Sequence, residues 1–129
     1  MLVATPLRIA TPRHSTTQKM EPQTSYSETE PSRSDIDALD GPLVIEFGTS
    51  WCGYCIAAQP VIRSALSGHP HLRHIRIADG RGRPLGRSFG VKLWPTLIFL
   101  RQGKELGRVV RPTAINEIER MLAQLDPAA

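Results

Sequence analysis

The sequence has very few cysteines: Cys52 and Cys55 are the only two in 129 residues. Small domains held together by disulfides carry several cysteine pairs, so this chain does not belong to that class. A disulfide between residues so close in sequence closes a very short loop and removes little entropy from the unfolded chain. The pair is therefore a poor structural crosslink and a good candidate for a reversible redox couple.

Aromatic residues are also scarce, with three Phe, two Tyr and two Trp. The formal net charge is +4, and it is uneven: residues 1–40 hold four Lys/Arg against six Asp/Glu, whereas residues 41–129 hold twelve against six. This basic balance suits acidic protein partners. The sequence lacks clusters of Lys and Arg interleaved with aromatic residues, so no nucleic-acid partner is expected.

Long apolar runs are absent too. No run approaches the roughly 20 residues of a membrane-spanning helix, so no membrane association is expected. The apolar start at residues 1–4 ends at Thr5-Pro6, well short of the roughly 7 to 15 residues of a secretory signal. The first 20 residues contain basic residues and no acid, which leaves a transit peptide open, and Met20 is an alternative start. Together with the low cysteine content, these features predict a cytoplasmic protein.

The composition of the chain changes near residue 34. Residues 1–33 are rich in Thr, Ser, Pro, Gln and Glu without a sustained apolar period, which predicts a disordered or flexible N-terminal extension. Residues 34–126 alternate between strand-like and helix-like patterns, and this length has room for one domain. No repeat is visible, so the architecture is expected to be a single unit.

The pattern of apolar residues predicts a mixed β-sheet flanked by helices, because the elements follow the order βα, βα, ββ, α. The expected strands are 43–47, 74–78, 96–100 and 105–110, and the expected helices are 34–39, 52–66, 85–89 and 115–125. Pro60 should kink the second helix, and Thr113 is the expected cap of the last. Residues 24–27 are a weak candidate for an extra edge strand.

The two cysteines lie where the strand 43–47 gives way to a helix. Unpaired N–H groups and the dipole at a helix start stabilise an anion, so Cys52 is expected to be the more acidic thiol and the nucleophile. Cys55 lies one turn further and is expected to resolve a mixed disulfide on Cys52. Glu46, in an otherwise apolar strand, is the candidate to take the proton of Cys55, and burial is expected to raise its pKa.

Two stretches of the chain resemble the thioredoxin family. Val44-Ile45-Glu46-Phe47 followed by Trp51-Cys52-Gly53-Tyr54-Cys55 is similar to the central strand and active-site turn, with Glu46 where the family usually has a buried Asp. Gly90-Val91-Lys92-Leu93-Trp94-Pro95-Thr96 is similar to the segment with the family's cis-proline. Pro60 and Gly103 match the helix-kinking proline and the glycine of the last hairpin. The resemblance spans residues 43–125 and implies an α/β thioredoxin fold.

The same resemblance implies a function. It implies a thiol–disulfide oxidoreductase without a bound cofactor that reduces protein disulfides and is itself reduced by a thioredoxin reductase or another dithiol donor. A cis bond at Pro95 would let the main chain of Trp94 pair with a target peptide beside Cys52. The candidate substrate-binding residues are Trp51, Gly53, Tyr54, Trp94, Pro95, Thr96 and Arg111. A monomer is expected.

Three departures from the family pattern leave alternatives open. Gly53-Tyr54 stands between the cysteines where thioredoxins usually have Gly-Pro, and this dipeptide also occurs in periplasmic disulfide isomerases. Gly48-Thr49 replaces the usual Trp-Ala, which removes an aromatic wall. Arg111 replaces a glycine, and its guanidinium would either stabilise a thiolate or be a solvated charge. An oxidant or isomerase, or a redox-switchable binding module formed by Trp51, Trp94 and Arg111, are therefore the alternatives.

Two further motifs have simpler interpretations than a ligand site. His69, His71 and His74 could supply zinc ligands together with the cysteines, but a metal on Cys52 would block the nucleophile, so no metal site is expected. The loop Gly80-Arg81-Gly82-Arg83 is basic and rich in glycine, but it lacks the fingerprint of a nucleotide-binding loop. A solvated loop is expected there.

Overall fold

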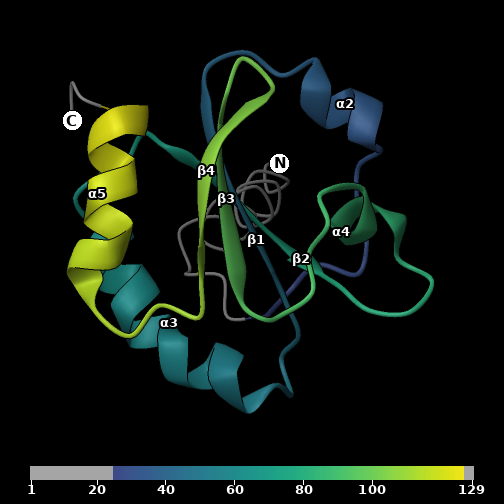
Figure 1. The fold of residues 1–129 in the computed structure, drawn as a ribbon, viewed down its shortest axis with the longest axis horizontal. Helices are drawn as coiled ribbons and strands as arrows, with labels where there is room; N and C mark the ends of the chain where they lie inside the picture. The colour runs from purple at the N-terminus through teal and green to yellow at the C-terminus, as the bar shows by residue number, and fades with distance from the viewer. Residues whose placement is uncertain (1–24, 127–129) are drawn as a thin grey trace, which may run out of the picture.

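The computed structural model describes residues 25–126, which form a central sheet with helices on both faces (Figure 1). The strands are Pro42–Gly48 (β1), Arg73–Ala78 (β2), Thr96–Arg101 (β3) and Lys104–Val110 (β4), and they lie in the order β2-β1-β3-β4. β1 is parallel to β2 and antiparallel to β3, which is antiparallel to β4. The mixed sheet is the expected one.

Each face of the sheet packs against two of the helices, which are Arg33–Asp37 (α2), Gly53–Leu66 (α3), Pro84–Ser88 (α4) and Ile115–Leu125 (α5). Alternate side chains of a strand point to opposite faces. Ile45 and Phe47 accordingly lie in the cluster that contains residues of α2 and α4, whereas Val44 lies in the cluster that contains residues of α3 and α5. Glu46 shares the face of Val44, so the alternation directs its carboxylate towards α3.

Local signals in the sequence account for most of the element ends. Gln102 and Gly103 both have positive φ values, 51° and 76°, which is the two-residue turn that suits a right-twisted hairpin between β3 and β4. Pro60 lies inside α3 as expected. The expected cap of α5 was wrong: the Glu117 carboxylate accepts the N–H groups of Thr113 and Ala114, both at 2.8 Å, so the cap comes from within the helix.

The folded region begins before the expected boundary at residue 34. Ser27 forms a parallel bridge with Ile77, in which its N–H and C=O pair with the main chain of Arg76 and Ala78 at 2.9 Å. The expected edge strand is thus reduced to one bridge on the outer side of β2. Tyr26 is buried next to it. Of the extension predicted for residues 1–33, residues 1–24 lie outside the described residues.

Candidate active site

Cys52 is the N-cap of α3. Its Sγ accepts the backbone N–H of Cys55 at 3.3 Å, so the sulfur takes the place that a Ser or Asp oxygen usually fills at the start of a helix. The first N–H groups of the helix point at the sulfur in this position. Cys52 is 8% exposed and Cys55 is 1% exposed, so Cys52 is the sulfur that a partner can reach.

Cys55 is a protonated thiol at neutral pH. Burial, together with the hydrogen bond and charge of Cys52, raises the pKa of Cys55 to about 11, although a backbone hydrogen bond at Thr49 and the hydroxyl of Tyr26 act in the opposite direction. The two cysteines are not joined by a disulfide. Cys55 must therefore lose a proton before it can attack a disulfide on Cys52.

Glu46 lies in a buried polar cluster beneath Cys55. It is fully buried, and its Oε2 accepts the hydroxyl of Tyr26 at 2.5 Å and the Gln59 amide at 2.9 Å. Its Oε1 lies 3.0 Å from Nε2 of His74 and 3.3 Å from Nε of Arg76. The parallel register pairs Glu46 with Arg76, which explains why a buried carboxylate has a buried cation beside it.

The expectation that the pKa of Glu46 would be raised was wrong. Burial does raise it, but the hydrogen bond from His74 and the charges of Arg76 and His74 outweigh burial and lower the pKa of Glu46 to about 2. Glu46 is consequently an anion in the resting protein. The missing information was the register between β1 and β2, which no pattern within either strand reveals.

Tyr26 is a buried neighbour of Glu46 that the sequence did not reveal, because it precedes the expected domain. It is 7% exposed, and the Arg76 guanidinium lies 4.2 Å from the centre of its ring. Burial and the charge of Glu46 raise the pKa of Tyr26 far above its ordinary value, so its hydroxyl stays neutral. The phenol therefore brings one proton to the space between the carboxylate and the inner thiol.

Gly48 makes room for this tyrosine. A Cβ at Gly48 would lie 2.7 Å from Sγ of Cys55 and 2.9 Å from the Tyr26 hydroxyl, so a side chain at this position would displace both. The sequence indicated that Gly48 removes an aromatic wall from the site. The structure shows that Tyr26 supplies an aromatic ring there instead. The sequence signal for this ring is the combination of a glycine at position 48 with an isolated tyrosine upstream.

The rim of the site carries two aromatic contacts. Trp51 is 75% exposed and meets Trp94 edge-on at 5.8 Å. Tyr54 is 59% exposed, and the guanidinium of Arg111 lies 3.6 Å from its ring centre. Exposed aromatic rings of this kind are typical of surfaces that bind other proteins.

The segment around Pro95 differs in part from expectation. The Trp94–Pro95 bond is cis, as the resemblance implied. The carbonyl of Trp94, which was expected to pair with a target, already accepts Nε of Arg111 at 2.8 Å. Thr96 is 1% exposed and donates its hydroxyl to the Leu93 carbonyl at 2.6 Å. Its side chain therefore holds the turn and does not reach a substrate.

The remaining candidates do not join the site. Nδ1 of His69 lies 3.1 Å from Asp126 and His74 binds Glu46, so the histidines do not converge on the cysteines. Among residues 25–126, no three His, Cys, Asp or Glu side chains are grouped so that they would hold a metal ion. Within that same range, every helix is too short or too polar to cross a bilayer.

The fold and the cysteine pair together define a class of protein. A thiol that caps a helix, with a second thiol one turn deeper, can alternate between a dithiol and a disulfide and exchange these states with a partner. On a mixed sheet with helices on both faces and a cis-proline in the segment before β3, this pair is the active site of a thiol–disulfide oxidoreductase with a thioredoxin fold.

Comparisons with known proteins identify the family. The thioredoxin family model matches residues 24–124. Thioredoxin 2 from Pseudomonas aeruginosa PAO1 is 47% identical, with a TM-score of 0.75 over 84% of this chain and 100% of that one. The thioredoxin of Chlamydia muridarum is 34% identical over 71 residues, which cover 54% of this chain and 69% of that protein. Thioredoxin H-type 1 of Nicotiana tabacum is 29% identical over 68 residues, 53% of this chain and 54% of that protein.

The chain belongs to the thioredoxin family. It is a protein-disulfide oxidoreductase, and its two neighbouring cysteines carry the redox chemistry. Membership of this family implies disulfide-containing protein substrates and a reductase partner.

Proposed function

We propose that this oxidoreductase reduces protein disulfides, with Cys52 as the nucleophile and Cys55 as the resolving thiol. The thiolate of Cys52 attacks one sulfur of the target, and the other target sulfur leaves as a thiolate. The thiolate of Cys55 then attacks Sγ of Cys52, which releases the second target sulfur and leaves a Cys52–Cys55 disulfide. The observation that carries this proposal is the placement of Cys52 as the cap of α3, with the Cys55 amide 3.3 Å from its sulfur.

The proton of Cys55 passes to Glu46 through Tyr26 in this proposal. The thiol gives its proton to the Tyr26 oxygen while the Tyr26 proton moves along the 2.5 Å hydrogen bond to Oε2 of Glu46. After this transfer the Tyr26 hydroxyl can donate to the new thiolate. Because the pKa of Glu46 is low, protonated Glu46 is short-lived. The proton transfer is completed because the Cys55 thiolate is consumed when the Cys52–Cys55 disulfide forms.

The surface that contacts the target, the oligomeric state, the compartment and the electron donor are also part of the proposal. Trp51, Gly53, Tyr54, Trp94, Pro95 and Arg111 form the contact surface around Cys52. The exposure of Trp51 and Tyr54 supports this assignment. The protein acts as a cytoplasmic monomer that a thioredoxin reductase or another dithiol donor returns to the dithiol state, and the low cysteine content supports a reducing compartment.

Insulin reduction tests the proposal directly. The wild-type chain is expected to reduce insulin catalytically, Cys52→Ser is expected to be inactive, and Cys55→Ser is expected to accumulate a mixed disulfide with the target through Cys52. A Cys52→Ser variant as active as the wild type would contradict the assigned roles. Partner binding that survives this substitution, together with an inactive wild type, would favour a binding module instead.

The direction of electron transfer needs a second measurement. The equilibrium reduction potential of the cysteine pair against glutathione is expected to lie in the reducing range of about −270 mV. A potential near about −120 mV would instead identify an oxidant. The exposed Tyr54 between the cysteines is the residue that motivates this comparison.

A further inference from the structure

A groove leads away from the cysteines along the loop Gly80-Arg81-Gly82-Arg83, which the proposed function does not use. It consists of two cavities, of about 450 and 390 Å³, that share the walls Asp79, Gly80, Arg81, Arg83 and Trp94. One cavity also reaches Thr49 and Trp51 beside Cys52, and the other reaches Arg87 in α4. We call this feature the basic groove.

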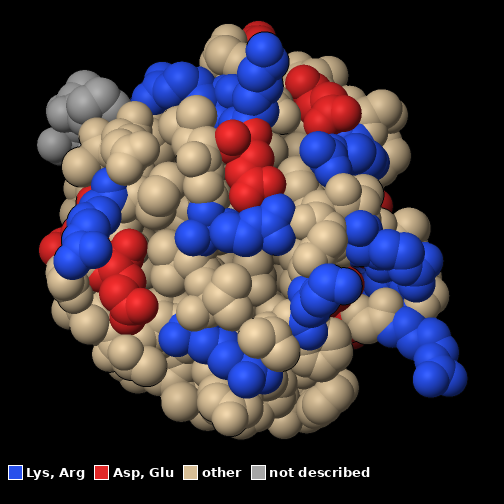
Figure 2. Space-filling model, viewed as in Figure 1, with Lys and Arg blue, Asp and Glu red and all other residues tan. Residues whose placement is uncertain are grey.

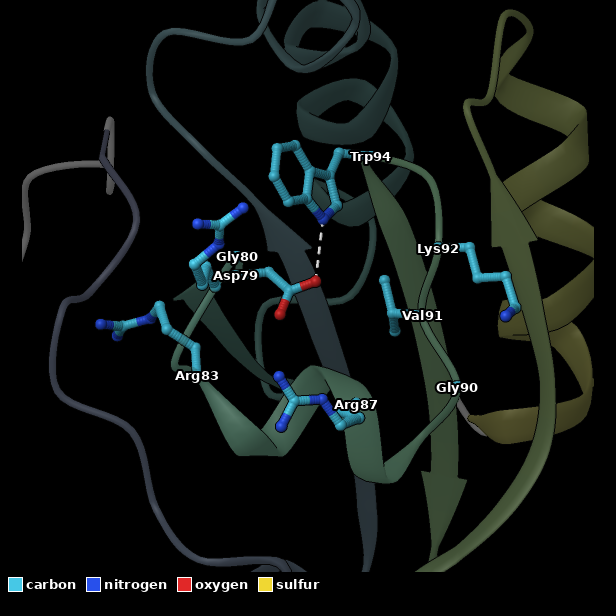
Figure 3. Close-up of a pocket in the computed structure, with 9 residues that line it drawn as sticks. Asp79, Gly80, Arg83, Arg87, Gly90, Val91, Lys92 and Trp94 are labelled. Carbon is cyan, nitrogen blue, oxygen red and sulfur yellow. Dashed lines mark hydrogen bonds between the residues drawn. The ribbon is translucent and has the colours of Figure 1, made fainter.

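The basic charges of the groove are only partly neutralised. Arg83 is held by the neighbouring segment, with ion pairs to Glu28 and Glu30. Figure 3 shows Arg83 directed away from Trp94, whereas Arg87 points into the groove towards Asp79. Arg81 and Arg87 form no ion pair with any residue in the range 25–126.

The groove keeps a net positive charge, because its lining contains Arg81, Arg83, Arg87 and Lys92 but only two acids, Asp79 and Glu28. The Asp79 carboxylate accepts Nε1 of Trp94 at 2.8 Å, and Glu28 is already paired with Arg83 (Figure 3). Lys92 also lines the groove, and Figure 3 shows its side chain directed away from Asp79. In Figure 2, Lys and Arg predominate on the side that carries α4 and the preceding loop. An anionic ligand is the chemistry that complements this surface.

The loop that presents Arg81 is anchored at its end. Gly80 and Gly82 have φ values of 136° and 78°, in the region that favours glycine. Arg83 anchors the end of the loop by donating Nε to the carbonyl of Ala78 at 2.5 Å. Arg83 thus holds the end of the loop that carries Arg81.

An unsatisfied polar atom lies at the end of the groove nearest the cysteines. Oγ1 of Thr49 is buried and has no hydrogen-bond partner within residues 25–126. A buried hydroxyl without a partner is costly, and a ligand that lies in the groove could satisfy it. A polypeptide supplies both a main chain for Thr49 and side-chain carboxylates for the arginines, whereas a small anion supplies only the second.

We propose that the basic groove binds an acidic segment of the substrate polypeptide next to the cysteine that Cys52 attacks, so that Arg81 and Arg87 select disulfides flanked by Asp or Glu. This inference rests on the proposed reduction of protein disulfides and names the class of protein substrate. The groove begins at Trp94, which packs with Cys52 in one cluster, so an extended segment can occupy both the groove and the active site.

Matched peptides test this inference. The first pair consists of two disulfide-linked peptides of equal length. The acidic peptide carries Asp and Glu on one side of the cysteine, and the neutral peptide carries Ser and Gln there. In the second pair these residues lie on the other side of the cysteine. With the full wild-type chain, kcat/KM for one acidic peptide is expected to exceed that for its neutral partner about fivefold, the size of two exposed ion pairs. Added salt is expected to reduce this ratio.

Two charge variants locate the effect. In Arg81→Gln/Arg87→Gln the ratio is expected to fall to about one, whereas in Arg63→Gln/Arg73→Gln, which has the same net charge, it is expected to persist. A ratio that persists in the first variant, or falls equally in both, would overturn the inference. Saturable binding of inorganic phosphate without any peptide preference would also overturn it, because the groove would then be a small-anion site. If the wild-type chain reduces neither the acidic nor the neutral peptide faster than Cys52→Ser does, the proposed function itself fails.

Discussion

The hydroxyl of Tyr26 donates a 2.5 Å hydrogen bond to Glu46, which joins the segment before the sheet to the carboxylate beneath Cys55. Removing this hydroxyl in Tyr26→Phe keeps the ring and breaks the route for the proton. The second step, in which Cys55 resolves a mixed disulfide, is expected to slow by at least about tenfold. Single-turnover release of a peptide from its mixed disulfide with Cys52 measures this step.

Tyr54→Phe is the matched control for Tyr26→Phe. Tyr54 also lies near the cysteines, but it is 59% exposed and is not bonded to Glu46. Its variant is expected to resolve the mixed disulfide at the wild-type rate. Equal rates for Tyr26→Phe and the wild type would show that Tyr26 has no part in proton transfer.

Gly48→Ala tests the close packing of Tyr26 against the inner thiol. The added Cβ would lie 2.7 Å from Sγ of Cys55, so the ring or the sulfur must move. The free energy of unfolding is expected to fall by about 1 to 3 kcal/mol, as for an overpacked core. Denaturant unfolding measures the change. Gly68→Ala, where no atom lies within 4 Å of the added Cβ, is expected to change stability far less.

The acid limb of the stability curve should report on Glu46. The pKa of Glu46 is about 2 in the folded chain, below its ordinary value of 4.5. A carboxyl whose pKa is lowered by folding stabilises the protein above its unfolded pKa, and this contribution is lost as the pH falls through the folded pKa. The free energy of unfolding is therefore expected to drop by about 3 kcal/mol between about pH 5 and about pH 2.

Two variants separate this effect from that of other acids. Glu46→Gln is expected to be less stable at neutral pH, because it removes the carboxylate that pairs with buried Arg76, and to lose most of the acid dependence. Glu117→Gln alters a surface carboxyl whose pKa is lowered by hydrogen bonds from the N–H groups of Thr113 and Ala114. It is expected to keep most of the drop. An unchanged acid limb in Glu46→Gln would contradict the ion-paired state of Glu46.

Arg111 combines favourable contacts with an unfavourable backbone. Its φ is 50°, which favours glycine, while its side chain contacts the Tyr54 ring and the Trp94 carbonyl. In Arg111→Gly the lost contacts and the relieved backbone oppose each other, so stability is expected to stay within about 1 kcal/mol of the wild type. Arg111→Ala loses the contacts without the relief and is expected to be less stable than Arg111→Gly by about 1 kcal/mol. Equal stabilities would show that the backbone is unstrained.

The sequence predicted the sheet and the cysteine pair because both depend on local patterns. The apolar run from Leu43 to Phe47, interrupted only by Glu46, identifies β1, and the turn residues Gln102 and Gly103 identify the hairpin. The position of Cys52 as a helix cap follows from the change of pattern at residue 52. Each of these features is encoded by a few consecutive residues.

The environment of Glu46 could not be predicted in the same way. His74 and Arg76 reach it because β2 lies beside β1 in one particular register, and Tyr26 reaches it from a segment more distant in sequence. The charge of Glu46 therefore depends on long-range pairing, whereas its burial depends on the strand that contains it. Only the burial of Glu46 could be inferred from the sequence. Burial alone raises the pKa of a carboxyl group, so the inferred direction of the pKa was wrong.

The single bridge at Ser27 gives the two halves of the catalytic cycle different supports. The sulfur that captures a target is held by α3. The phenol that we propose to deprotonate the inner sulfur is carried by a short segment, which is attached through one pair of main-chain hydrogen bonds, the buried Tyr26 itself, and contacts with Arg83 and Leu85. Detaching that short segment would leave capture intact and delay release. The lifetime of the covalent complex with a target would then be set by a segment that lies outside the helix with the two cysteines.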